Sequence, residues 1–411
     1  MFEELKKLSH HFLEIKNNPY KRALVRFTDF SNRMSLIIGQ RGVGKTTSLV
    51  QILLDKVEGD IFDERILYIQ TDHFQVASTS LYEIAEQFNL HGGKWIAFDE
   101  IHKYPNWSKE LKSIYDTFPK LHIFSSGSSA LEIFKGSHDL SRRAVKYHMQ
   151  GMSFREYLEL AYNFNFPSYT LEEICDQHQR ITSNINKQLN QKELKVIPLF
   201  NQYLKIGYYP FFNELNNEAL YKITLEQNIH TTIESDIAAI FPQLMGSSIR
   251  KIKNLLSFIA ETVPFIPNWK KIMNILDIGD ERTLKSYFKH LEDAGLIRSI
   301  SKATKKISKL ESPEKVYLDN TNQIYAISPF SVMNKGTIRE TFLLSMISQK
   351  YSVALPKNGD FLVADRYTFE VGGKNKSFNQ IKSLKNSYLI CDEIERGIGN
   401  KIPLWVFGFL Y

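Results

Sequence analysis

In the first 150 residues, segments with the hydrophobic pattern of strands alternate with segments in which apolar residues recur at helical spacing. Short apolar runs bounded by polar or glycine-containing segments predict buried strands at 34–39, 65–70, 94–101, 121–129 and 145–150. Between them, apolar residues recur at helical spacing in 47–56, 78–88 and 108–118. Strands that alternate with helices are joined by right-handed crossovers, so the pattern predicts a parallel sheet covered on both faces.

The pattern changes after residue 150, and a single core seldom organises a chain of 411 residues. A mainly helical region follows, and then a small helical unit that a β-hairpin closes. Short strands return in the last eighty or so residues, where 353–373 is typical of a hairpin. The sequence therefore predicts four segments, 1–150, 151–245, 246–330 and 331–411.

A glycine-punctuated loop follows the first predicted strand, and a predicted helix follows the loop. Gly39-Gln40-Arg41-Gly42-Val43-Gly44-Lys45-Thr46 satisfies the Walker A pattern in full, and Thr47 continues it into the helix. Such glycines let several backbone N–H groups converge on phosphate oxygens, and the helix N-terminus adds its positive end. Lys45 is expected to reach the β- and γ-phosphates, and the Thr46 hydroxyl to ligate Mg²⁺. The loop predicts a nucleoside triphosphate site, most simply for ATP with Mg²⁺.

Two acids end the third predicted strand. Trp95-Ile96-Ala97-Phe98-Asp99-Glu100 has the form of a Walker B strand, and ligands bind at the carboxyl edge of a parallel sheet. Asp99 would hold the Mg²⁺ shell, and Glu100 would orient and polarise the attacking water. The pair predicts hydrolysis as well as binding.

These motifs and several other segments resemble a known ATPase family. In the sequence, RILYIQ lies between the loop and FDE, and this insertion with the second acid resembles the additional-strand branch of P-loop ATPases, which includes the AAA+ proteins. FDEIHKYPNW, SSGSSALEI and SRRAVKYHMQGMSFREYL are similar to a bacterial and archaeal AAA+-like family whose members carry a C-terminal domain of unknown function. Later segments, from YLKIGYYPFF to IPLWVFGFLY, extend the resemblance over essentially the whole chain. It implies an α/β, parallel-sheet P-loop ATPase core.

The same resemblance implies two further catalytic residues. Ser128, with Ser129 as its rival, matches the polar sensor position at the end of the fourth strand. Arg143, with Arg142 as an equally good chemical candidate, matches an arginine that would stabilise charge on the transferring phosphoryl group. The family usually shows Gly-Arg here, whereas this chain has Arg-Arg. An arginine that acts across a subunit interface would require an oligomer, and one that acts in cis would not.

The helical unit at 246–330 resembles a winged helix-turn-helix. Its segment RTLKSYFKHLEDAGLI gathers apolar residues on one helical face, with Arg282, Lys285 and Lys289 off that face. The lysines within 301–315 could form a basic wing over DNA phosphates. The competing interpretation is a solvated hairpin on a domain that merely spaces the ATPase from its partner. The formal net charge of +7 is compatible with both.

The final segment resembles a restriction-endonuclease-like, PD-(D/E)XK fold. Glu340 on a helix, Asp360 before a strand and Glu370 in the next strand could approach one Mg²⁺. Asp360 and Glu370 are therefore a candidate second metal site.

Nuclease chemistry in that fold normally needs a lysine two residues after the second acid. Gly372 stands at this position, and Lys374 lies two residues too far along. Gln380 could sit on the following helix. The missing lysine favours a degenerate domain that binds a partner or supports the structure without cleaving DNA.

The cysteines and the hydropathy pattern indicate the cellular compartment of the protein. Cys175 and Cys391 are far apart in sequence, which argues against a disulfide framework and for a reducing interior, and no spacing of His or Cys predicts a zinc site. No apolar run reaches the length of a membrane span, and the N-terminus lacks a signal peptide's apolar stretch. A cytoplasmic location is the default expectation.

Three functions remain open on this sequence. The leading one is an ATP-driven mechanical or switch protein whose C-terminal domains engage DNA or a protein partner. The second is a nuclease gated by ATP, in defence against foreign DNA. The third is a nucleotide-dependent scaffold that binds ATP and turns it over slowly.

Overall fold

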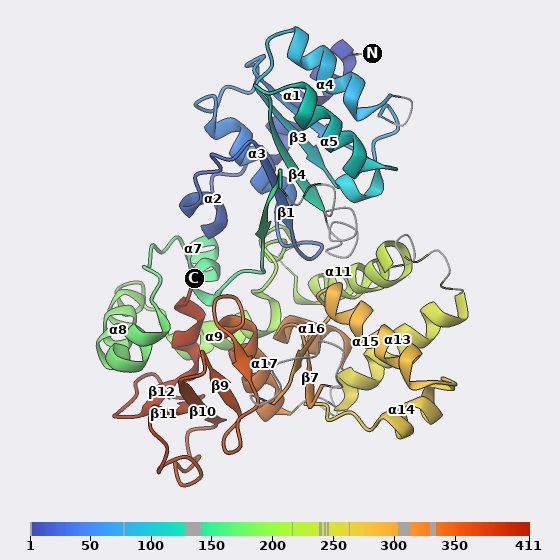
Figure 1. The fold of residues 1–411 in the computed structure, drawn as a ribbon. Coiled ribbons are helices and arrows are strands. Elements are labelled where there is room, and N and C mark those ends of the chain that lie inside the picture. Colours follow the sequence, from blue (N-terminus) through green and yellow to red (C-terminus); the bar gives the residue numbers. More distant parts are fainter. Residues whose placement is uncertain are drawn as a thin grey trace. The chain divides into compact units, whose positions relative to one another are not determined.

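Figure 1 shows the computed structural model, which describes residues 2–76, 79–127, 140, 142–215, 217–237, 241, 244, 246–262, 264–302, 313–328 and 334–411. The chain separates into two compact units, Met1–Gln150 and Gly151–Tyr411. Among the helices in those ranges, none combines the length and the apolarity that a membrane crossing needs.

A five-stranded parallel sheet forms the first unit, in the order β2-β3-β4-β1-β5. Its strands are β1 (Met34–Ile38), β2 (Ile66–Gln70), β3 (Trp95–Asp99), β4 (His122–Gly127) and β5 (Val145–His148). The helices are α1 (Phe2–Lys16), α2 (Ala23–Phe27), α3 (Lys45–Asp55), α4 (Leu81–Leu90), the short η1 (Ile101–Lys103) and α5 (Trp107–Thr117). The predicted α/β parallel-sheet fold is confirmed.

The order of the strands in the sheet differs from their order along the chain. RILYIQ, which contains β2, separates β1 from β3 in the sequence, yet β2 lies at the edge of the sheet. The strand that lies between β1 and β3 in space is β4, which pairs with both of them. This happens because strand pairing is not local: β4 crosses back to fill the place beside the loop-bearing strand. The carboxyl ends of β1, β4 and β3 therefore meet at one edge.

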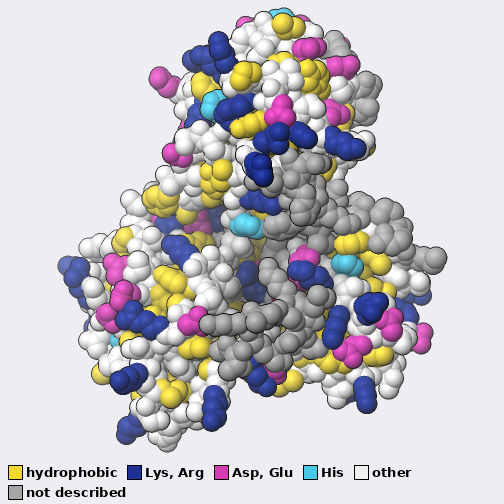
Figure 2. All heavy atoms as spheres, in the orientation of Figure 1, with side chains coloured by type: hydrophobic (Ala, Val, Ile, Leu, Met, Phe, Trp, Pro, Cys, Tyr) yellow, Lys and Arg dark blue, Asp and Glu magenta, His cyan; other side chains and the backbone are white. Residues whose placement is uncertain are grey.

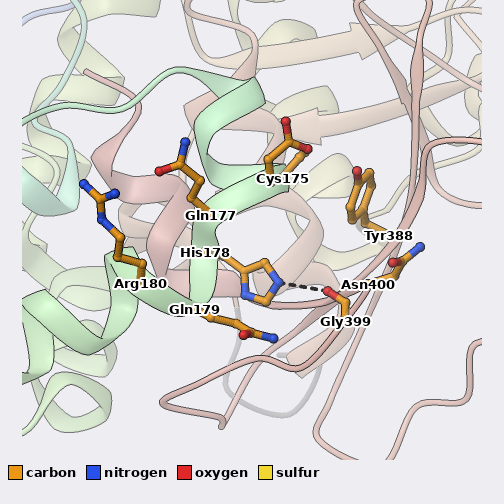
Figure 3. A pocket seen from close by; sticks show the side chains of 9 residues that line it. Cys175, Gln177, His178, Gln179, Arg180, Tyr388, Gly399 and Asn400 are labelled. Atoms are coloured by element: carbon orange, nitrogen blue, oxygen red, sulfur yellow. Dashed lines mark hydrogen bonds between the residues drawn. The ribbon is translucent and has the colours of Figure 1, made fainter.

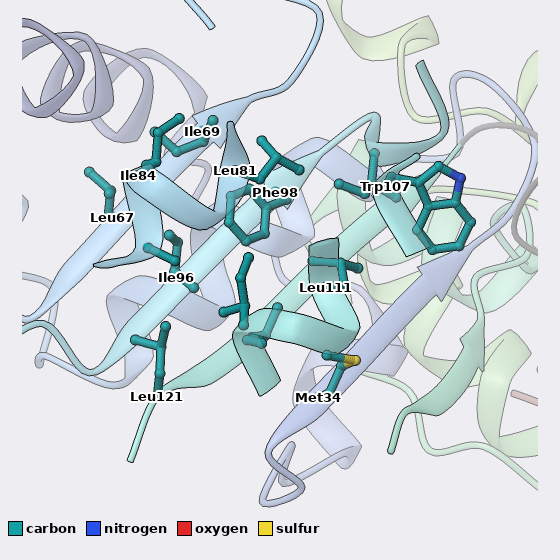
Figure 4. Close-up of a cluster of buried hydrophobic side chains, with 14 of the residues drawn as sticks. Met34, Leu67, Ile69, Leu81, Ile84, Ile96, Phe98, Trp107, Leu111 and Leu121 are labelled. Atoms are coloured by element: carbon teal, nitrogen blue, oxygen red, sulfur yellow. The ribbon is translucent and has the colours of Figure 1, made fainter. Parts of the chain in front are cut away.

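Strand residues with a period of two pack against α4 and α5 on one face of this sheet. The cluster, drawn in Figure 4, combines every second residue of the strands with the apolar stripes of the two helices; its members include Met34, Leu67, Ile69, Ile96, Phe98, Leu81, Ile84, Trp107 and Leu111. On the other side α3 packs against β2, β3 and β4. Both faces are covered, which is why the strands read as continuous apolar runs.

Local signals fix where helices begin. A capping box of Ser80 and Glu83 starts α4, since each side chain accepts a hydrogen bond from the other residue's backbone N–H. The same device starts the first two helices of the second unit.

The second unit begins with a helical region and continues with strands. The helical region contains α7 (Phe154–Tyr162), α8 (Leu171–Gln191), α9 (Val196–Ile206), α10 (Phe212–Leu215), α11 (Glu218–Thr231) and the π-helical η2 (Thr232–Ile237). After it come α13 (Gly246–Thr262), α14 (Trp269–Leu276), α15 (Glu281–Asp293), β6 (Ile297–Ile300), β7 (Lys315–Leu318) and α16 (Thr321–Ile327). The last elements are α17 (Lys335–Ile347), β8 (Val353–Ala354), β9 (Phe361–Val363), β10 (Tyr367–Gly372), β11 (Ser387–Cys391), β12 (Lys401–Pro403) and η4 (Leu404–Phe409).

Two small sheets organise these elements. Strands β6 and β7 pair antiparallel after the three helices α13 to α15, and Phe265 pairs antiparallel with Val316 of β7. Farther along, a five-stranded sheet in the order β12-β11-β10-β9-β8 has two antiparallel and two parallel pairings. Helix α17 packs against its strand β10. Gln380 lies in a turn after β10, and so the helix expected at this residue is not formed.

Candidate functional site

The glycine-punctuated loop joins the end of β1 to the start of α3. Gly42 and Gly44 have φ values of 85° and 100°, in the left-handed region that glycine adopts without a Cβ clash. Lys45, the first residue of α3, is 5% exposed, and its Nζ donates to the carbonyl oxygens of Gly39 at 3.0 Å and Gln40 at 2.8 Å. The ammonium group is thus held over its own loop.

Asp99 lies at the centre of the site, at the end of β3. Its Oδ2 accepts hydrogen bonds from the Thr46 hydroxyl and the Tyr68 hydroxyl, both at 2.7 Å. Its Oδ1 accepts one from the Ser126 hydroxyl. The structure therefore brings the last residue of the Walker A pattern against the first acid of the Walker B strand.

Neighbouring strands supply the two side chains that fix Asp99. Tyr68 comes from β2 and Ser126 from β4, the strands on either side of β3. Burial, followed by the charge of Asp99, raises the pKa of Tyr68, so its hydroxyl stays protonated and donates. Neither residue was predicted from the sequence. The signal for Ser126 was present, because it is a polar residue at the end of an apolar strand.

Glu100 follows Asp99 in a left-handed backbone conformation, with φ 53°. Its N–H donates to the Ser126 Oγ at 3.2 Å. Its carboxylate Oε2 lies 3.5 Å from the Lys103 Nζ and 3.7 Å from the His102 Nε2. A non-glycine residue in this conformation is strained, and such strain is typical of functional sites.

Lys103 is shared between two carboxylates. Besides Glu100, its Nζ contacts Asp72 just after β2. Burial works against the charge of Lys103, but Asp72 and Glu100 outweigh it and raise the Lys103 pKa. The ammonium group is therefore firmly protonated beside Glu100.

Of the two remaining predicted catalytic residues, Arg143 lies within the described residues and Ser128 does not. Ser128 and Ser129 lie outside the described residues. Arg143 donates from Nε and Nη2 to the two carboxylate oxygens of Asp116 on α5, at 2.8 and 2.9 Å. Arg142 is exposed.

The predicted second acidic site lies in the second unit, and its carboxylates already have protein partners. Asp360 Oδ2 accepts from the Val371 N–H at 2.8 Å, and Glu340 Oε2 accepts from the Tyr317 hydroxyl at 2.6 Å. Glu370 is 3% exposed. Within the described residues, no group of three or more His, Cys, Asp or Glu side chains is arranged to hold a metal ion, although the charges of all three carboxylates act on Lys376.

A lysine does reach Glu370, although not the one nearest in sequence. Lys376 Nζ lies 2.7 Å from Glu370 Oε1, and this contact raises the Lys376 pKa. The Lys376 side chain crosses Gly372, where an added Cβ would come within 2.5 Å of it. Gln380, with its amide nitrogen turned toward Glu370, donates to both carboxylate oxygens. Lys374 is exposed instead.

The predicted DNA-contacting cations of α15 are partly neutralised on their own helix. Lys285 pairs with Glu281 at 2.8 Å, and Lys289 pairs with Asp293, while Arg282 is exposed. On the face drawn in Figure 2, basic and acidic side chains of Gly151–Tyr411 are interspersed. Of the lysines in 301–315, Lys302 and Lys315 lie in the described ranges, and each has a glutamate partner: Glu314 and Glu340.

The second unit also carries an open cavity of about 780 Å³, lined by α8, by Tyr388 of β11 and by Gly399 and Asn400 just before β12. Figure 3 shows its lining, in which the His178 ring is hydrogen-bonded to the Gly399 carbonyl at 2.9 Å. Burial, followed by the charge of Asp176, raises the pKa of the Cys175 thiol to about 12. The thiol stays protonated at neutral pH and offers no nucleophile.

A phosphate-binding loop at the carboxyl edge of a parallel sheet, with two acids at the end of another strand of the same sheet, defines the P-loop class of nucleotide-binding domains. Comparison with known proteins agrees: residues 31–158 match the model of a family described as an AAA domain. Residues 197–337 match a domain of unknown function, DUF8612. The first match includes the loop and both acids.

Two uncharacterized proteins of Methanocaldococcus jannaschii are similar over most of the chain. One is 27% identical, covering 99% of this chain and 89% of the relative, and the other is 25% identical, covering 85% and 74%. Among solved structures, a Walker-type ATPase of Pyrococcus abyssi is 12% identical with a TM-score of 0.38, over 78% of this chain and 95% of that one. AMPPCP-bound DnaA from Aquifex aeolicus is 14% identical with a TM-score of 0.26, over 71% and 88%.

Proposed function

We propose that this protein binds Mg-ATP in the segment Gly39–Thr47 and hydrolyses it, and that hydrolysis changes the conformation of domains that engage DNA or a protein partner. The observation that carries the proposal is the 2.7 Å contact between the Thr46 hydroxyl and the Asp99 carboxylate. It brings together, from helix α3 and strand β3, the two side chains that P-loop enzymes use around their metal ion.

The donor set fits Mg²⁺. This cation prefers oxygen ligands, and Thr46 Oγ1 and Asp99 Oδ2 are adjacent oxygen atoms at the carboxyl edge of the sheet. A bound Mg²⁺ ion would supply charge neutralisation on the β- and γ-phosphates.

The chain's own groups divide the remaining work. Lys45 exchanges the carbonyls of Gly39 and Gln40 for phosphate oxygens, while the loop N–H groups hold the anion. Glu100 accepts a proton from the attacking water as the phosphoryl group transfers. Ser126 fixes the positions of Glu100 and Asp99 relative to each other, because its hydroxyl is hydrogen-bonded to both residues.

Two substitutions test hydrolysis. Glu100→Gln keeps the shape of the side chain and removes the base, so it should bind ATP and release phosphate at background rate. Lys45→Ala should fail to bind. Equal, background-level phosphate release from wild type and Glu100→Gln would remove the hydrolysis claim. If wild type then still bound ATP tightly, with release below roughly one per minute, the slow-turnover scaffold would be the correct reading.

In the second unit, we propose that α13, α14, α15 and the β6–β7 hairpin form a winged helix. The order of three helices followed by two antiparallel strands supports this, as does the isolated antiparallel bridge between Phe265 and Val316 of β7. DNA contact would be salt-sensitive and weak, since Lys285 and Lys289 are each paired with an acid. Neutralising both lysines should weaken DNA binding further. DNA binding that does not change with salt concentration would contradict an interface formed mainly with phosphates.

For the C-terminal sheet we propose a binding or structural role without cleavage, and the ATP-gated nuclease is the alternative. Glu370 is buried and occupied by Lys376 and Gln380, which supports the first reading. The contact of Lys376 with Glu370 also favours the alternative, an ATP-gated nuclease. Incubation of plasmid with Mg²⁺ or Mn²⁺, with and without ATP, should leave it intact. Cleavage lost in both Glu370→Gln and Lys376→Met would establish the nuclease instead.

A further inference from the structure

Arg22 lies under the phosphate-binding loop and is 7% exposed. Its Nη1 donates to the Val43 carbonyl at 2.7 Å, and its Nη2 donates to the Gln150 carbonyl at 2.9 Å. Val43 is in the loop, between two glycines with positive φ. Gln150 is the last residue of the first unit. One guanidinium group therefore bridges the loop and the segment that leads out of its unit.

A second set of contacts joins the same two segments from the other end of the loop. The Met149 N–H donates to the Ile38 carbonyl at 2.7 Å, and the Ser48 hydroxyl lies 3.6 Å from the Met149 sulfur. At Gly39, an added Cβ would stand 2.2 Å from the Met149 carbonyl oxygen. This close approach is possible because glycine has no side chain. Met149 and Gln150 are thus packed directly against the loop.

Peptide geometry shows what the Val43 contact does. In a planar trans peptide the C=O and the next N–H point in opposite directions. Arg22 holds the Val43 carbonyl, and so it fixes the direction of the Gly44 N–H on the opposite side of the same peptide. Gly44 immediately precedes Lys45 and α3, where N–H groups converge on phosphate.

We infer that Arg22 is a positioning residue with two effects. It sets the Val43–Gly44 peptide in the orientation that binds phosphate, and it passes the state of the loop to Gln150. The inference rests on the proposed ATP binding and adds to it the route by which the loop communicates with the end of its own unit. A purely architectural arginine would stabilise the fold and leave nucleotide affinity unchanged.

The chain offers a matched control for that alternative. Arg33 also bridges two backbone carbonyls, donating from Nη2 to Tyr115 at 2.8 Å and Phe118 at 3.1 Å. Arg33 immediately precedes β1, at the opposite end of this strand from the loop. Replacing either arginine with lysine keeps the charge and removes the planar guanidinium group, which reaches its two carbonyls through both Nη atoms in Arg22 and through Nη2 alone in Arg33.

The experiment compares wild type, Arg22→Lys and Arg33→Lys as full-length chains. Melting temperature without nucleotide reports stability, titration with an ATP analogue reports affinity, and hydrogen exchange with and without the analogue reports residues 145–152. Arg22→Lys should bind the analogue about tenfold or more weakly, which is what losing one charge-assisted hydrogen bond to a buried carbonyl corresponds to. The nucleotide-dependent exchange at Met149 and Gln150 should be lost with it. Arg33→Lys should lower only the melting temperature.

Wild-type affinity and wild-type exchange in Arg22→Lys would overturn the inference. Equal loss of affinity in the two variants would do the same, because it would trace to general destabilisation. If Arg22→Lys does not fold, Arg22→Gln, which keeps one amide donor, takes its place in the comparison. Failure of wild type to bind the analogue would instead count against the proposed function itself, with Lys45→Ala as the reference for no binding.

Discussion

Replacing Ser126 with alanine tests whether the end of β4 organises both acids of the site. The Ser126 hydroxyl donates to Asp99 and accepts the Glu100 N–H at 3.2 Å, and the residue is fully buried. A hydrogen bond to a charged group contributes about 1.5–3 kcal/mol, and a neutral one about 0.5–1.5 kcal/mol. Groups that orient a metal-ligating carboxylate typically change activity by about 10- to 100-fold when removed. We expect a fall of that size in phosphate release at saturating Mg-ATP, together with a lower melting temperature.

Ser125, the preceding residue on β4, provides the control. It is equally buried, but its hydroxyl has no hydrogen-bond partner among the described residues. Removing a buried hydroxyl that lacks a partner costs little, so Ser125→Ala should retain the wild-type rate and stability. If Ser126→Ala hydrolyses ATP as fast as Ser125→Ala, the reasoning that links β4 to the two acids is wrong. A lower melting temperature with an unchanged rate would limit Ser126 to a structural role.

Three further predictions concern other parts of the chain. Arg143→Ala should lower steady-state phosphate release if Arg143 stabilises the transferring phosphoryl group. Asp116→Ala, which removes the ion pair with Arg143, should not lower it. Equal loss of activity in both variants would indicate that the pair is structural. Ser128→Ala should lower hydrolysis without lowering ATP affinity, and an unchanged rate would leave Ser126 as the sensor. Burial and then the charge of Asp360 raise the pKa of Glu340, although the Tyr317 hydrogen bond opposes them. The folded state therefore holds more protons than the unfolded state from about pH 4.5 up to the raised pKa, and stability falls as pH rises through this window. Denaturant unfolding of Glu340→Gln should show less of this pH dependence than wild type.

The parts of the molecule that the sequence predicted are those set by local patterns. β1, the loop and α3 follow one another directly, and the acids Asp99 and Glu100 end a continuous apolar run, so period and spacing suffice. The contacts of Asp99 with Tyr68 and Ser126 depend instead on which strands lie beside β3. That order results from pairing between strands distant in sequence, which no local period encodes.

The lysine that contacts Glu370 could not be predicted from the sequence, for a related reason. Counting along the chain points to Gly372 and then to Lys374, because a strand residue two positions from Glu370 shares its face. The structure uses Lys376, which returns from a turn and occupies the space that the absent Gly372 side chain leaves. Which side chain of a turn can contact Glu370 depends on the conformation of the turn. The sequence of this turn carries no signal as strong as the period of a strand.

The distribution of hydrogen bonds within the nucleotide site indicates where binding and hydrolysis would be registered. Asp99 is held by Thr46, Tyr68 and Ser126, so the strand that carries it is already ordered and would rearrange little. Lys45, in contrast, must give up two loop carbonyls before it can reach a phosphate. Binding of ATP at this site would therefore change the loop more than the sheet. The loop is also the element that Arg22 ties to Gln150, so a switch driven by ATP binding would act through this bridge, and one driven by hydrolysis through Glu100 and its neighbour Lys103.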